Sequence, residues 1–250
     1  MALTGSPRPA LFLTDHASLE RDQVTLSGAE GRHASTVRRL RPGERVDLTD
    51  GAGLLAECVV AATGPGLLEL TVLRRQFDPP PQPAICVVQA LPKGDRGELA
   101  VETMTEVGVD VIVPWAAERC VASWAAGPRG QRALERWRAT AREAAKQSRR
   151  SRLPEVTELA TAKTVIERAA LAASMAVLDP GVGVAIGSLP LPASGEVMLI
   201  VGPEGGLSPA ERDAFAAAGA VAVRLGPSVL RSSTAGAAAA AVLLSRSGRW

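Results

Sequence analysis

The sequence predicts an α/β protein with a small β-rich N-terminal domain and a larger domain built on a parallel sheet. Three observations predict this class. From residue 84 onward, apolar strand-like runs alternate with helical patterns, which is typical of a parallel sheet covered on both faces. Residues 24–75 read instead as short strands separated by Gly and Pro. The proline-rich stretch 77–83 predicts a stiff linker, so we expect domains at 1–76 and 84–250.

The expected N-terminal domain combines short strands with one helical insert. Strands are predicted at 45–49, 54–62 and 67–73. The turn residues Asp50-Gly51 and Gly64-Pro65-Gly66 join these strands as hairpins. A helix-like insert is expected at 30–40, and the pattern as a whole indicates a small β-barrel-like module.

The expected C-terminal domain alternates strands and helices. Apolar, β-branched runs predict the strands, and segments with periodic apolar residues predict the helices. In chain order these elements are strand 84–90, helix 96–107, strand 109–113, helix 129–149, helix 163–171, strand 175–178, strand 197–201, helix 208–218, strand 221–225 and helix 230–245. With 46% hydrophobic and 22% charged residues, a chain of 250 residues has enough apolar side chains for a buried core.

Composition argues against several classes of protein. The three cysteines are odd in number and far apart, which is typical of a reducing compartment, so we expect a cytoplasmic protein. Pro7-Arg8-Pro9 lies where a signal peptide would need its apolar stretch. The apolar run 235–244 is too short to span a bilayer, so we expect no membrane association. His16 and His33 are the only histidines, and we therefore expect no metal.

Two glycine-containing motifs near the C-terminus predict a small-molecule site. They are Val201-Gly-Pro-Glu-Gly-Gly-Leu-Ser208 and Leu225-Gly-Pro-Ser-Val-Leu-Arg-Ser-Ser-Thr234, and each lies between a predicted strand and a predicted helix. Glycine lets a ligand lie against the backbone, and N–H groups at the start of the next helix can bind its polar groups. The first motif lacks the Lys-Ser/Thr of a P-loop and the spacing of a dinucleotide turn. Both also suit ordinary strand-to-helix turns, and the residues alone leave this alternative open.

The segment 129–152 is the most charge-biased part of the chain, and its bias is positive. Its cations are Arg129, Arg132, Arg136, Arg138, Arg142, Lys146, Arg149, Arg150 and Arg152, against Glu135 and Glu143. Arg138, Arg142, Lys146 and Arg149 follow helical spacing and are expected to share one face. Such a stripe suits contacts with RNA phosphates, although a merely solvated helix face is the alternative.

Further segments, together with the two glycine motifs, carry a resemblance to a known family. They are Arg32-His33, Val37-Arg38-Arg39-Leu40-Arg41-Pro42-Gly43-Glu44, Lys93-Gly94-Asp95-Arg96, Glu106-Val107-Gly108-Val109, Gln147, Arg150, Arg152 and Pro154-Glu155. Together these residues resemble the SPOUT superfamily of S-adenosylmethionine methyltransferases. The resemblance is closer to its bacterial members that methylate N3 of a uridine in small-subunit ribosomal RNA, and it covers most of the chain.

The resemblance implies a fold, a methyl donor and partners. The C-terminal domain is expected to be a trefoil-knotted SPOUT domain, and the N-terminal one a PUA-like RNA-binding domain. Expected partners are S-adenosylmethionine, ribosomal RNA or the small ribosomal subunit, and a second copy of the chain as a homodimer. Residues expected at the donor are Leu178, Gly202, Glu204, Gly205, Gly206, Leu225, Gly226 and Leu230. Residues expected at the RNA are Arg32, His33, Arg38, Lys93, Arg96, Arg142, Lys146, Arg149 and Arg150.

Arg231 and Glu204 are the candidate catalytic residues. Loss of the N3 proton of uracil leaves negative charge on the two flanking carbonyl oxygens, and a nearby cation favours that anion. Arg231 is the candidate for this cation, and pairing with a phosphate or a carboxylate is its alternative role. Glu204 is a candidate base that could instead, in its Pro-Glu-Gly-Gly turn, bind nearby amides.

Three positions depart from the family pattern. Ser232-Ser233-Thr234 stands where Thr-Glu-Thr is usual, Lys146 where an acid is usual, and Thr103 where a lysine is common. Without the glutamate, the general base stays unassigned. A SPOUT enzyme of other specificity, such as a ribose 2′-O methyltransferase, and a non-catalytic RNA-binding assembly factor are the alternatives.

Overall fold

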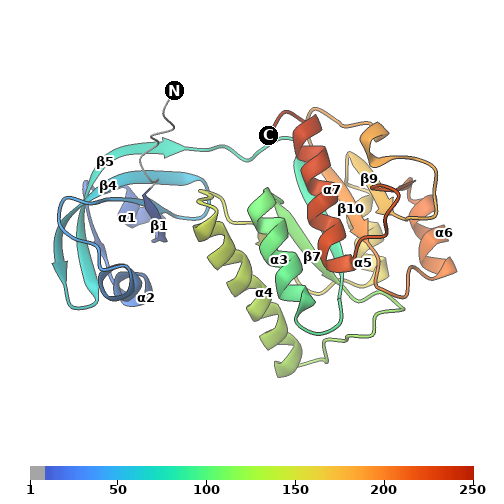
Figure 1. Ribbon diagram of the computed structural model, residues 1–250, viewed down its shortest axis with the longest axis horizontal. Coiled ribbons are helices and arrows are strands. Elements are labelled where there is room, and N and C mark those ends of the chain that lie inside the picture. The colour runs from blue at the N-terminus through green and yellow to red at the C-terminus, as the bar shows by residue number, and fades with distance from the viewer. Residues whose placement is uncertain (1–8) are drawn as a thin grey trace. The chain divides into compact units, whose positions relative to one another are not determined.

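The structure, a computed structural model, describes residues 9–250 and divides into two compact units (Figure 1). The first unit extends to Pro80 and also includes Ala145–Leu153. The second unit comprises Pro81–Ala144 and Pro154–Trp250. The expected start of the N-terminal domain at residue 1 and the Pro7-Arg8 pair lie outside the described residues.

The first unit is built on one five-stranded sheet. Its elements are β1 (Ala10–Leu13), α1 (His16–Leu19), β2 (Gln23–Leu26), α2 (Gly28–Arg32), the π-helical turn η1 (His33–Val37), β3 (Arg45–Thr49), β4 (Leu54–Gly64) and β5 (Leu67–Phe77). The strand order is β1-β3-β4-β5-β2, with β1 parallel to β3 and all other neighbours antiparallel. The expected β-rich module is thus present, and β1 and β2 form the two edges of its sheet. A single core that includes Phe12, Leu48 and Leu70 holds it together.

Residues 145–153 are bound to this first unit by backbone and side-chain hydrogen bonds. The N–H of Gly53 donates to the carbonyl of Ser151 over 3.1 Å, and the N–H of Leu153 donates to the carbonyl of Gly51 over 2.9 Å. The Arg152 guanidinium donates to the carbonyl of Asp78 over 2.8 Å. The sequence places these residues in the C-terminal domain. The structure instead places residues 145–153 in the first unit, because their polar backbone groups form hydrogen bonds there.

The second unit contains a six-stranded parallel sheet. Its elements are β6 (Ala84–Ala90), α3 (Arg96–Val107), β7 (Val111–Trp115), α4 (Pro128–Gln147, whose last turn belongs to the first unit), β8 (Glu155–Val156), α5 (Ala162–Ala169), β9 (Ser174–Leu178), the 3-10 turn η2 (Ile186–Ser188), β10 (Glu196–Val201), α6 (Pro209–Ala217), β11 (Val221–Val223) and α7 (Ser232–Arg246). The strand order is β11-β9-β10-β6-β7-β8. Every neighbouring pair is parallel, which confirms the predicted fold class.

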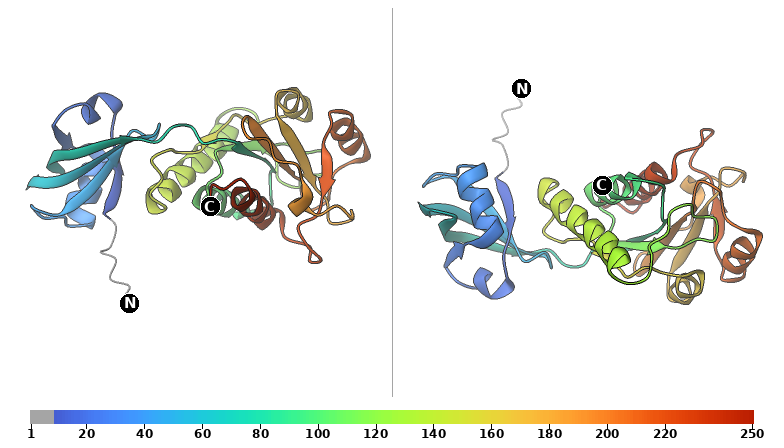
Figure 2. Two further views of the ribbon diagram at one scale, coloured as in Figure 1. Left: turned by 90° about the horizontal axis from the view of Figure 1, so that it is seen from above. Right: turned by 90° about the horizontal axis from the view of Figure 1, so that it is seen from below.

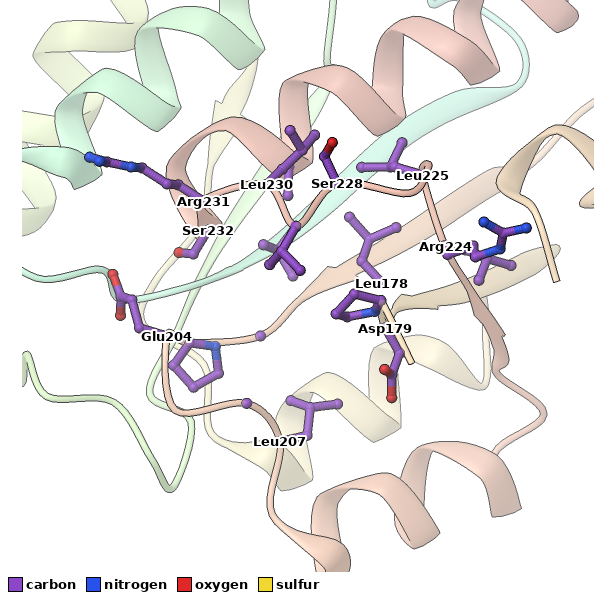
Figure 3. Close-up of a pocket in the computed structure, with 18 of the residues that line it drawn as sticks. Leu178, Asp179, Glu204, Leu207, Arg224, Leu225, Ser228, Leu230, Arg231 and Ser232 are labelled. Carbon is purple, nitrogen blue, oxygen red and sulfur yellow. The ribbon is translucent and has the colours of Figure 1, made fainter. Parts of the chain in front are cut away.

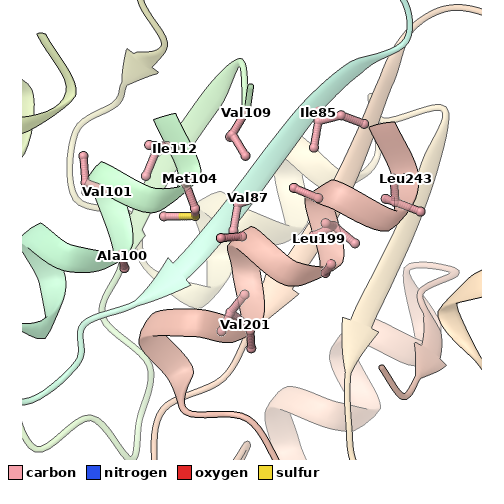
Figure 4. Packing of buried hydrophobic residues seen from close by; sticks show 14 of the residues in the cluster. Ile85, Val87, Ala100, Val101, Met104, Val109, Ile112, Leu199, Val201 and Leu243 are labelled. Carbon is pink, nitrogen blue, oxygen red and sulfur yellow. The ribbon is translucent and has the colours of Figure 1, made fainter. Parts of the chain in front are cut away.

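Helices cover both faces of this sheet (Figure 2). On one face, α3, α4 and α7 enclose the largest core, in which Val87 and Leu199 of the sheet contact Met104 and Leu243 of the helices (Figure 4). On the other face, α5 and α6 cover a second core that includes Phe215. The apolar strand runs are therefore buried on both sides, as the sequence pattern indicates.

Several strand boundaries and short elements differ from the sequence prediction. β4 ends at Gly64 rather than 62, β5 at Phe77 rather than 73 and β11 at Val223 rather than 225, so the expected linker 77–83 begins inside β5. β7 begins at Val111 rather than Val109, because Gly108 ends α3 with a φ of +106° and the N–H of Val109 still donates to Met104. The two-residue strand β8 and the edge strand β1 carry too few residues to give a pattern. No helix of the described chain is both long and apolar enough to cross a membrane.

Candidate active site

A pocket of about 370 Å³ lies in the second unit at the carboxyl ends of β9, β10 and β11 (Figure 3). In open parallel sheets, ligands bind at this edge. Most of its lining comes from the two glycine motifs. The lining residues are Leu178, Asp179, Pro180, Val201, Gly202, Pro203, Glu204, Gly206, Leu207, Arg212, Val223, Arg224, Leu225, Gly226, Ser228, Val229, Leu230, Arg231, Ser232 and Ala235.

The first glycine motif forms one wall of the pocket through its backbone. Gly206 has a φ of +69°, a conformation that side chains rarely adopt. Ser208 then begins α6 with a capping box, in which Ser208 and Glu211 each bind the other's backbone N–H. The sequence of this motif thus fixes both the turn at the pocket and the helix that follows.

Gly205 differs from its neighbours in this motif. It does not line the pocket. A Cβ atom at Gly205 would lie 3.2 Å from Cβ of Arg119 and 3.3 Å from the Arg119 carbonyl. The lack of a side chain at Gly205 therefore makes room for the loop that follows β7, rather than for a ligand.

Apolar side chains form the opposite walls. Leu178 ends β9, and Leu225 and Leu230 belong to the second glycine motif (Figure 3). Val229 and Leu230 are 77% and 39% exposed. A ligand in the pocket would cover apolar surface here. Of the eight predicted donor residues, the structure brings all but Gly205 together in this lining.

The polar groups Glu204, Arg231 and Ser232 lie at one end of the pocket (Figure 3). An oxygen of Glu204 accepts a hydrogen bond of 3.4 Å from the N–H of Lys93, in the loop after β6. This contact agrees with the alternative role of Glu204 as a partner for nearby amides. Arg231 is exposed and directly precedes α7.

Sequence reasoning missed the loop after β7. Its Arg119 donates a hydrogen bond of 3.3 Å to the carbonyl of Gly205. The N–H of Glu118 donates to Oε1 of Glu211 over 2.8 Å, and Glu211 is buried. Glu211 thus binds this loop and the helix start behind the first glycine motif at once. The capping-box spacing of Ser208 and Glu211 was visible in the sequence, but the partner loop was not.

The predicted RNA-binding residues occur in both units. In the first unit, His33, Arg38, Lys146 and Arg149 line a small cleft of about 50 Å³ beside β1. The His33 ring packs edge-on against Phe12. Arg32 is exposed in this unit, and Arg150 is half-buried. In the second unit, Lys93 and Arg142 are exposed and Arg96 is half-buried.

The prediction that Lys146 shares an exposed basic face is wrong. Its side chain is 5% exposed, and its ammonium lies 2.8 Å from a carboxylate oxygen of Glu30. Arg149 lies beyond the end of α4, with a φ of +59°. Lys146 is still in the last turn of α4 but is buried by its pairing with Glu30, whereas Arg149 follows the end of the helix, so helical spacing does not extend to Arg149.

Arg138 is also paired rather than free. Its guanidinium donates to Glu135 over 3.0 Å and to Glu158 over 2.8 Å. It also reaches the carbonyl of Val156. Of the four cations expected to form the stripe, Arg142 and Arg149 are exposed, and these two carry the electrostatic argument for RNA contact.

Burial leaves two of the three cysteines, Cys58 and Cys86, without a reactive environment. Burial raises the pKa of Cys58 to about 12 and also raises the pKa of Cys86. Both thiols therefore stay protonated and act as small core residues. No group of three or more His, Cys, Asp or Glu side chains in the described chain could hold a metal ion.

Comparison with known sequences gives two family matches. Residues 79–244 match the RNA methyltransferase domain, and residues 26–73 match the RNA methyltransferase PUA domain. The chain is 48% identical over 244 residues to ribosomal RNA small subunit methyltransferase E of Mycobacterium bovis, covering 96% of this chain and 93% of that protein. It is 27% identical to the enzyme of the same name from Bacillus subtilis, covering 89% of this chain and 90% of that protein.

A solved structure agrees with these matches. The ribosomal RNA small subunit methyltransferase E of Neisseria gonorrhoeae, solved bound to S-adenosyl methionine, superposes with a TM-score of 0.84 at 26% identity. The alignment covers 96% of this chain and 98% of that chain. The first family match spans more than half of the chain, and the mycobacterial relative spans nearly all of it. This chain therefore belongs to the ribosomal RNA small subunit methyltransferase E family.

Proposed function

We propose that this protein transfers a methyl group from S-adenosylmethionine to N3 of a uridine in the RNA of the small ribosomal subunit. The observation that carries this proposal is the pocket that the two glycine motifs form at the carboxyl ends of β9, β10 and β11. The family membership of the chain supports the reaction class, and the resemblance of its motifs to the uridine-N3 enzymes supports the acceptor atom.

The pocket fits the methyl donor. Its volume of about 370 Å³ lies within the usual range of small-molecule sites, and leucine and valine side chains provide an apolar wall. Gly202, Gly206 and Gly226 leave backbone groups open to a ligand. We therefore assign the donor site to the lining residues Leu178, Gly202, Glu204, Gly206, Leu225, Gly226 and Leu230. Gly205 supports this site from outside.

The donor, when bound, supplies an electrophilic methyl group on a sulfonium sulfur. The protein must bring N3 of the acceptor in line with that methyl and favour loss of the N3 proton. Arg231 is the candidate for the second task, because it belongs to the pocket lining and its positive charge would favour the negative charge on the uracil oxygens. We leave the base that takes the proton unassigned, since Ser233 stands where the family usually has a glutamate.

RNA binding is assigned to exposed cations of both units. Arg32, Arg38 and Arg149 belong to the first unit, and Lys93 and Arg142 belong to the second. Guanidinium and ammonium groups contact phosphates without reading sequence, so they position the RNA and do not select the base. In this assignment residues 1–76 bind RNA, 77–83 are a linker and 84–250 hold the donor, with Ala145–Leu153 as the exception described above.

We further propose a cytoplasmic homodimer with a trefoil-knotted second domain, as the family resemblance implies. The stretch 233–244 is rich in alanine, which permits close approach of a second helix and predicts that α7 forms the dimer contact, but the structure does not support that role. Most of α7 is buried within its own unit, against the core that α3 and the sheet share. Support comes from the exposed apolar side chains Leu99, Val229 and Leu230, which a partner subunit could cover.

Calorimetric titration and a methylation assay test the function together. The purified protein should bind S-adenosylmethionine and should methylate small-subunit RNA, with the product nucleoside identified by mass spectrometry as uridine methylated on N3. A product methylated on the ribose would replace the proposed acceptor. Absence of donor binding in the folded protein would reject the enzyme altogether.

A further inference from the structure

The loop after β7, residues 116–127, is fixed to the first glycine motif through its backbone. The N–H of Glu118 donates to Oε1 of Glu211 over 2.8 Å, and Oε2 of the same carboxylate accepts from the N–H of Ser208 over 2.9 Å. Glu211 is buried, so water does not compete for these hydrogen bonds. The backbone of the loop therefore has a defined position behind one wall of the pocket.

Arg119, the next residue of this loop, has a side chain that is only weakly held. Its guanidinium donates to the Gly205 carbonyl over 3.3 Å, which is longer than the usual value of about 2.9–3.0 Å for such a bond. Arg119 is exposed, and no carboxylate of residues 9–250 forms an ion pair with it. A guanidinium carries N–H donors in a planar fork, so one bond to a carbonyl leaves most of them open to a ligand.

Arg119 can act on the donor pocket through Gly205. Gly205 does not line the pocket, but Glu204 and Gly206 on either side of it do. The Gly205 carbonyl lies in the peptide plane that Gly205 shares with Gly206, so its orientation and the φ of Gly206 change together. That φ is +69° and shapes the pocket wall. A ligand that orders Arg119 would therefore also order this part of the wall.

The surroundings of Arg119 favour RNA as that ligand. The loop leads directly into α4, which begins with the exposed cations Arg129 and Arg132. Lys93, in the loop after β6, is exposed as well, and its N–H contacts Glu204 of the same glycine motif. All these cations belong to the part of the chain that matches the RNA methyltransferase domain. Several exposed cations on neighbouring segments suit the repeated phosphates of a nucleic acid.

We infer that Arg119 binds a phosphate of the RNA while its guanidinium also holds the Gly205 carbonyl, and that this shared contact couples RNA binding to donor binding. After one ligand has ordered the side chain and the turn, the other ligand loses less conformational entropy when it binds. Such coupling is reciprocal, so each ligand raises the affinity for the other by the same factor. The inference rests on the proposed function, because it takes the donor and the RNA as its two ligands.

Filter binding measures this coupling. The affinity for small-subunit RNA is determined without and with saturating S-adenosylhomocysteine, which lacks the methyl group and cannot react, and the ratio of the two affinities is the coupling factor. The wild-type protein should give a factor of about five or more. In Arg119→Ala the factor should fall to within about twofold of unity. The slope of log RNA affinity against log salt should also decrease by about 1, as expected for one lost phosphate contact.

Arg119→Lys separates the two contacts of the guanidinium. Lysine keeps a positive charge for the phosphate, but its ammonium lacks the planar fork that can bind a carbonyl and a phosphate together. This variant should therefore keep the salt slope and lose the coupling. Arg142→Ala is the matched control, because Arg142 is exposed on α4 and does not line the pocket. It should reduce the salt slope by about 1 and keep the wild-type coupling factor.

Calorimetry with S-adenosylhomocysteine alone distinguishes coupling from structural support. Without RNA, Arg119→Ala should bind this ligand within about threefold of wild type, since Arg119 does not line the pocket. A larger loss would reduce Arg119 to a structural support of the donor site and would overturn the inference.

The inference would also be overturned by a wild-type coupling factor within about twofold of unity, by an unchanged factor in either Arg119 variant, or by an unchanged salt slope in Arg119→Ala. Wild-type protein that binds neither S-adenosylhomocysteine nor S-adenosylmethionine, or that does not bind RNA, would instead reject the proposed function and the inference with it. The two failures are distinguishable, because the binding of each ligand alone is measured before their coupling.

Discussion

Gly206 has a φ of +69°, and its place in the pocket lining makes backbone conformation part of the proposed donor site. A residue with a Cβ atom is strained by about 1–2 kcal/mol in this region. Gly205, one position earlier, leaves space for Arg119 instead. Two adjacent glycines therefore serve different purposes, one at the ligand and one at a neighbouring loop.

We predict that Gly206→Ala lowers the affinity for S-adenosylmethionine by about tenfold, because strain of this size shifts the turn away from the binding conformation. Gly219→Ala is the matched control. Gly219 has a φ of +90°, lies outside the pocket lining and has no neighbouring atom within 4 Å of an added Cβ. Calorimetry should show wild-type affinity for the control. Equal affinities in both variants would remove Gly206 from the donor site.

His16 and Asp50 form a pair that should respond to pH. A hydrogen bond from the imidazole to the Asp50 carboxylate raises the pKa of His16 above 6.5. Burial raises the pKa of Asp50, but hydrogen bonds from His16 and from backbone N–H groups outweigh it and hold the value below 3.8. The stabilisation by His16 is thus complete below pH 6.5 and is lost as pH rises through its raised pKa.

We predict that NMR titration of His16 gives a pKa above 6.5 in the wild-type protein and a lower value in Asp50→Asn. A His16 titration that does not change in Asp50→Asn would show that the pair does not form in solution.

At the scale of elements, α4 and the residues that follow it illustrate how one charged segment serves two purposes. Arg142 is exposed on the helix. Lys146, one turn later, is buried against Glu30 in the first unit. A positive charge is therefore available for phosphate contact at Arg142, whereas at Lys146 it forms a structural ion pair.

Charge reversal at Arg142 should weaken RNA binding at all sequences and reduce the slope of log affinity against log salt by about 1, as expected for one lost phosphate contact. Lys146→Met should leave that slope unchanged. It should lower the free energy of unfolding by about 3 kcal/mol, because Glu30 would keep an unpaired buried charge. Filter-binding titrations over a range of salt and chemical denaturation measure the two effects. An unchanged slope in Arg142→Glu would mean that this face is only solvated.

Elements were predictable where local sequence patterns determine them, and not where they depend on residues far apart in the sequence. β6, α3 and β10 were predicted to within one residue, because their apolar patterns result from local burial on a sheet. The pairing of Lys146 with Glu30 joins residues 116 positions apart, and no local pattern contains it. The contact of Arg119 with Gly205 also joins residues far apart in the sequence, 86 positions, and no local pattern contains it. The pocket lining was largely predictable, since glycine marks the turns that form it.

At the scale of the whole molecule, the proposal requires one protein to bind both a small donor and a large RNA. The donor pocket lies within the second unit, and candidate RNA contacts occur in both units. The two units are not two consecutive stretches of the sequence, because Ala145–Leu153 packs with the first unit. Truncation at the linker would therefore leave the first unit incomplete.

We expect a homodimer at assay concentration. Sedimentation should give about twice the monomer mass of 25.9 kDa. Leu99→Lys and Val229→Lys place charges at exposed apolar positions and should shift the equilibrium toward monomer, whereas Leu171→Lys should not. Leu171 is 86% exposed after α5 and has no role in the proposed interface. A fully active monomer would reject the dimer.

The most direct measurement of the central claim is nucleoside analysis of small-subunit ribosomal RNA from cells with and without this chain. The account predicts that uridine methylated on N3 is present in the first sample and absent from the second. Purified protein with S-adenosylmethionine should restore it, and the Gly206→Ala variant should do so more slowly. If uridine methylated on N3 persists without the chain, or if a different methylated nucleoside disappears, the proposed reaction is contradicted.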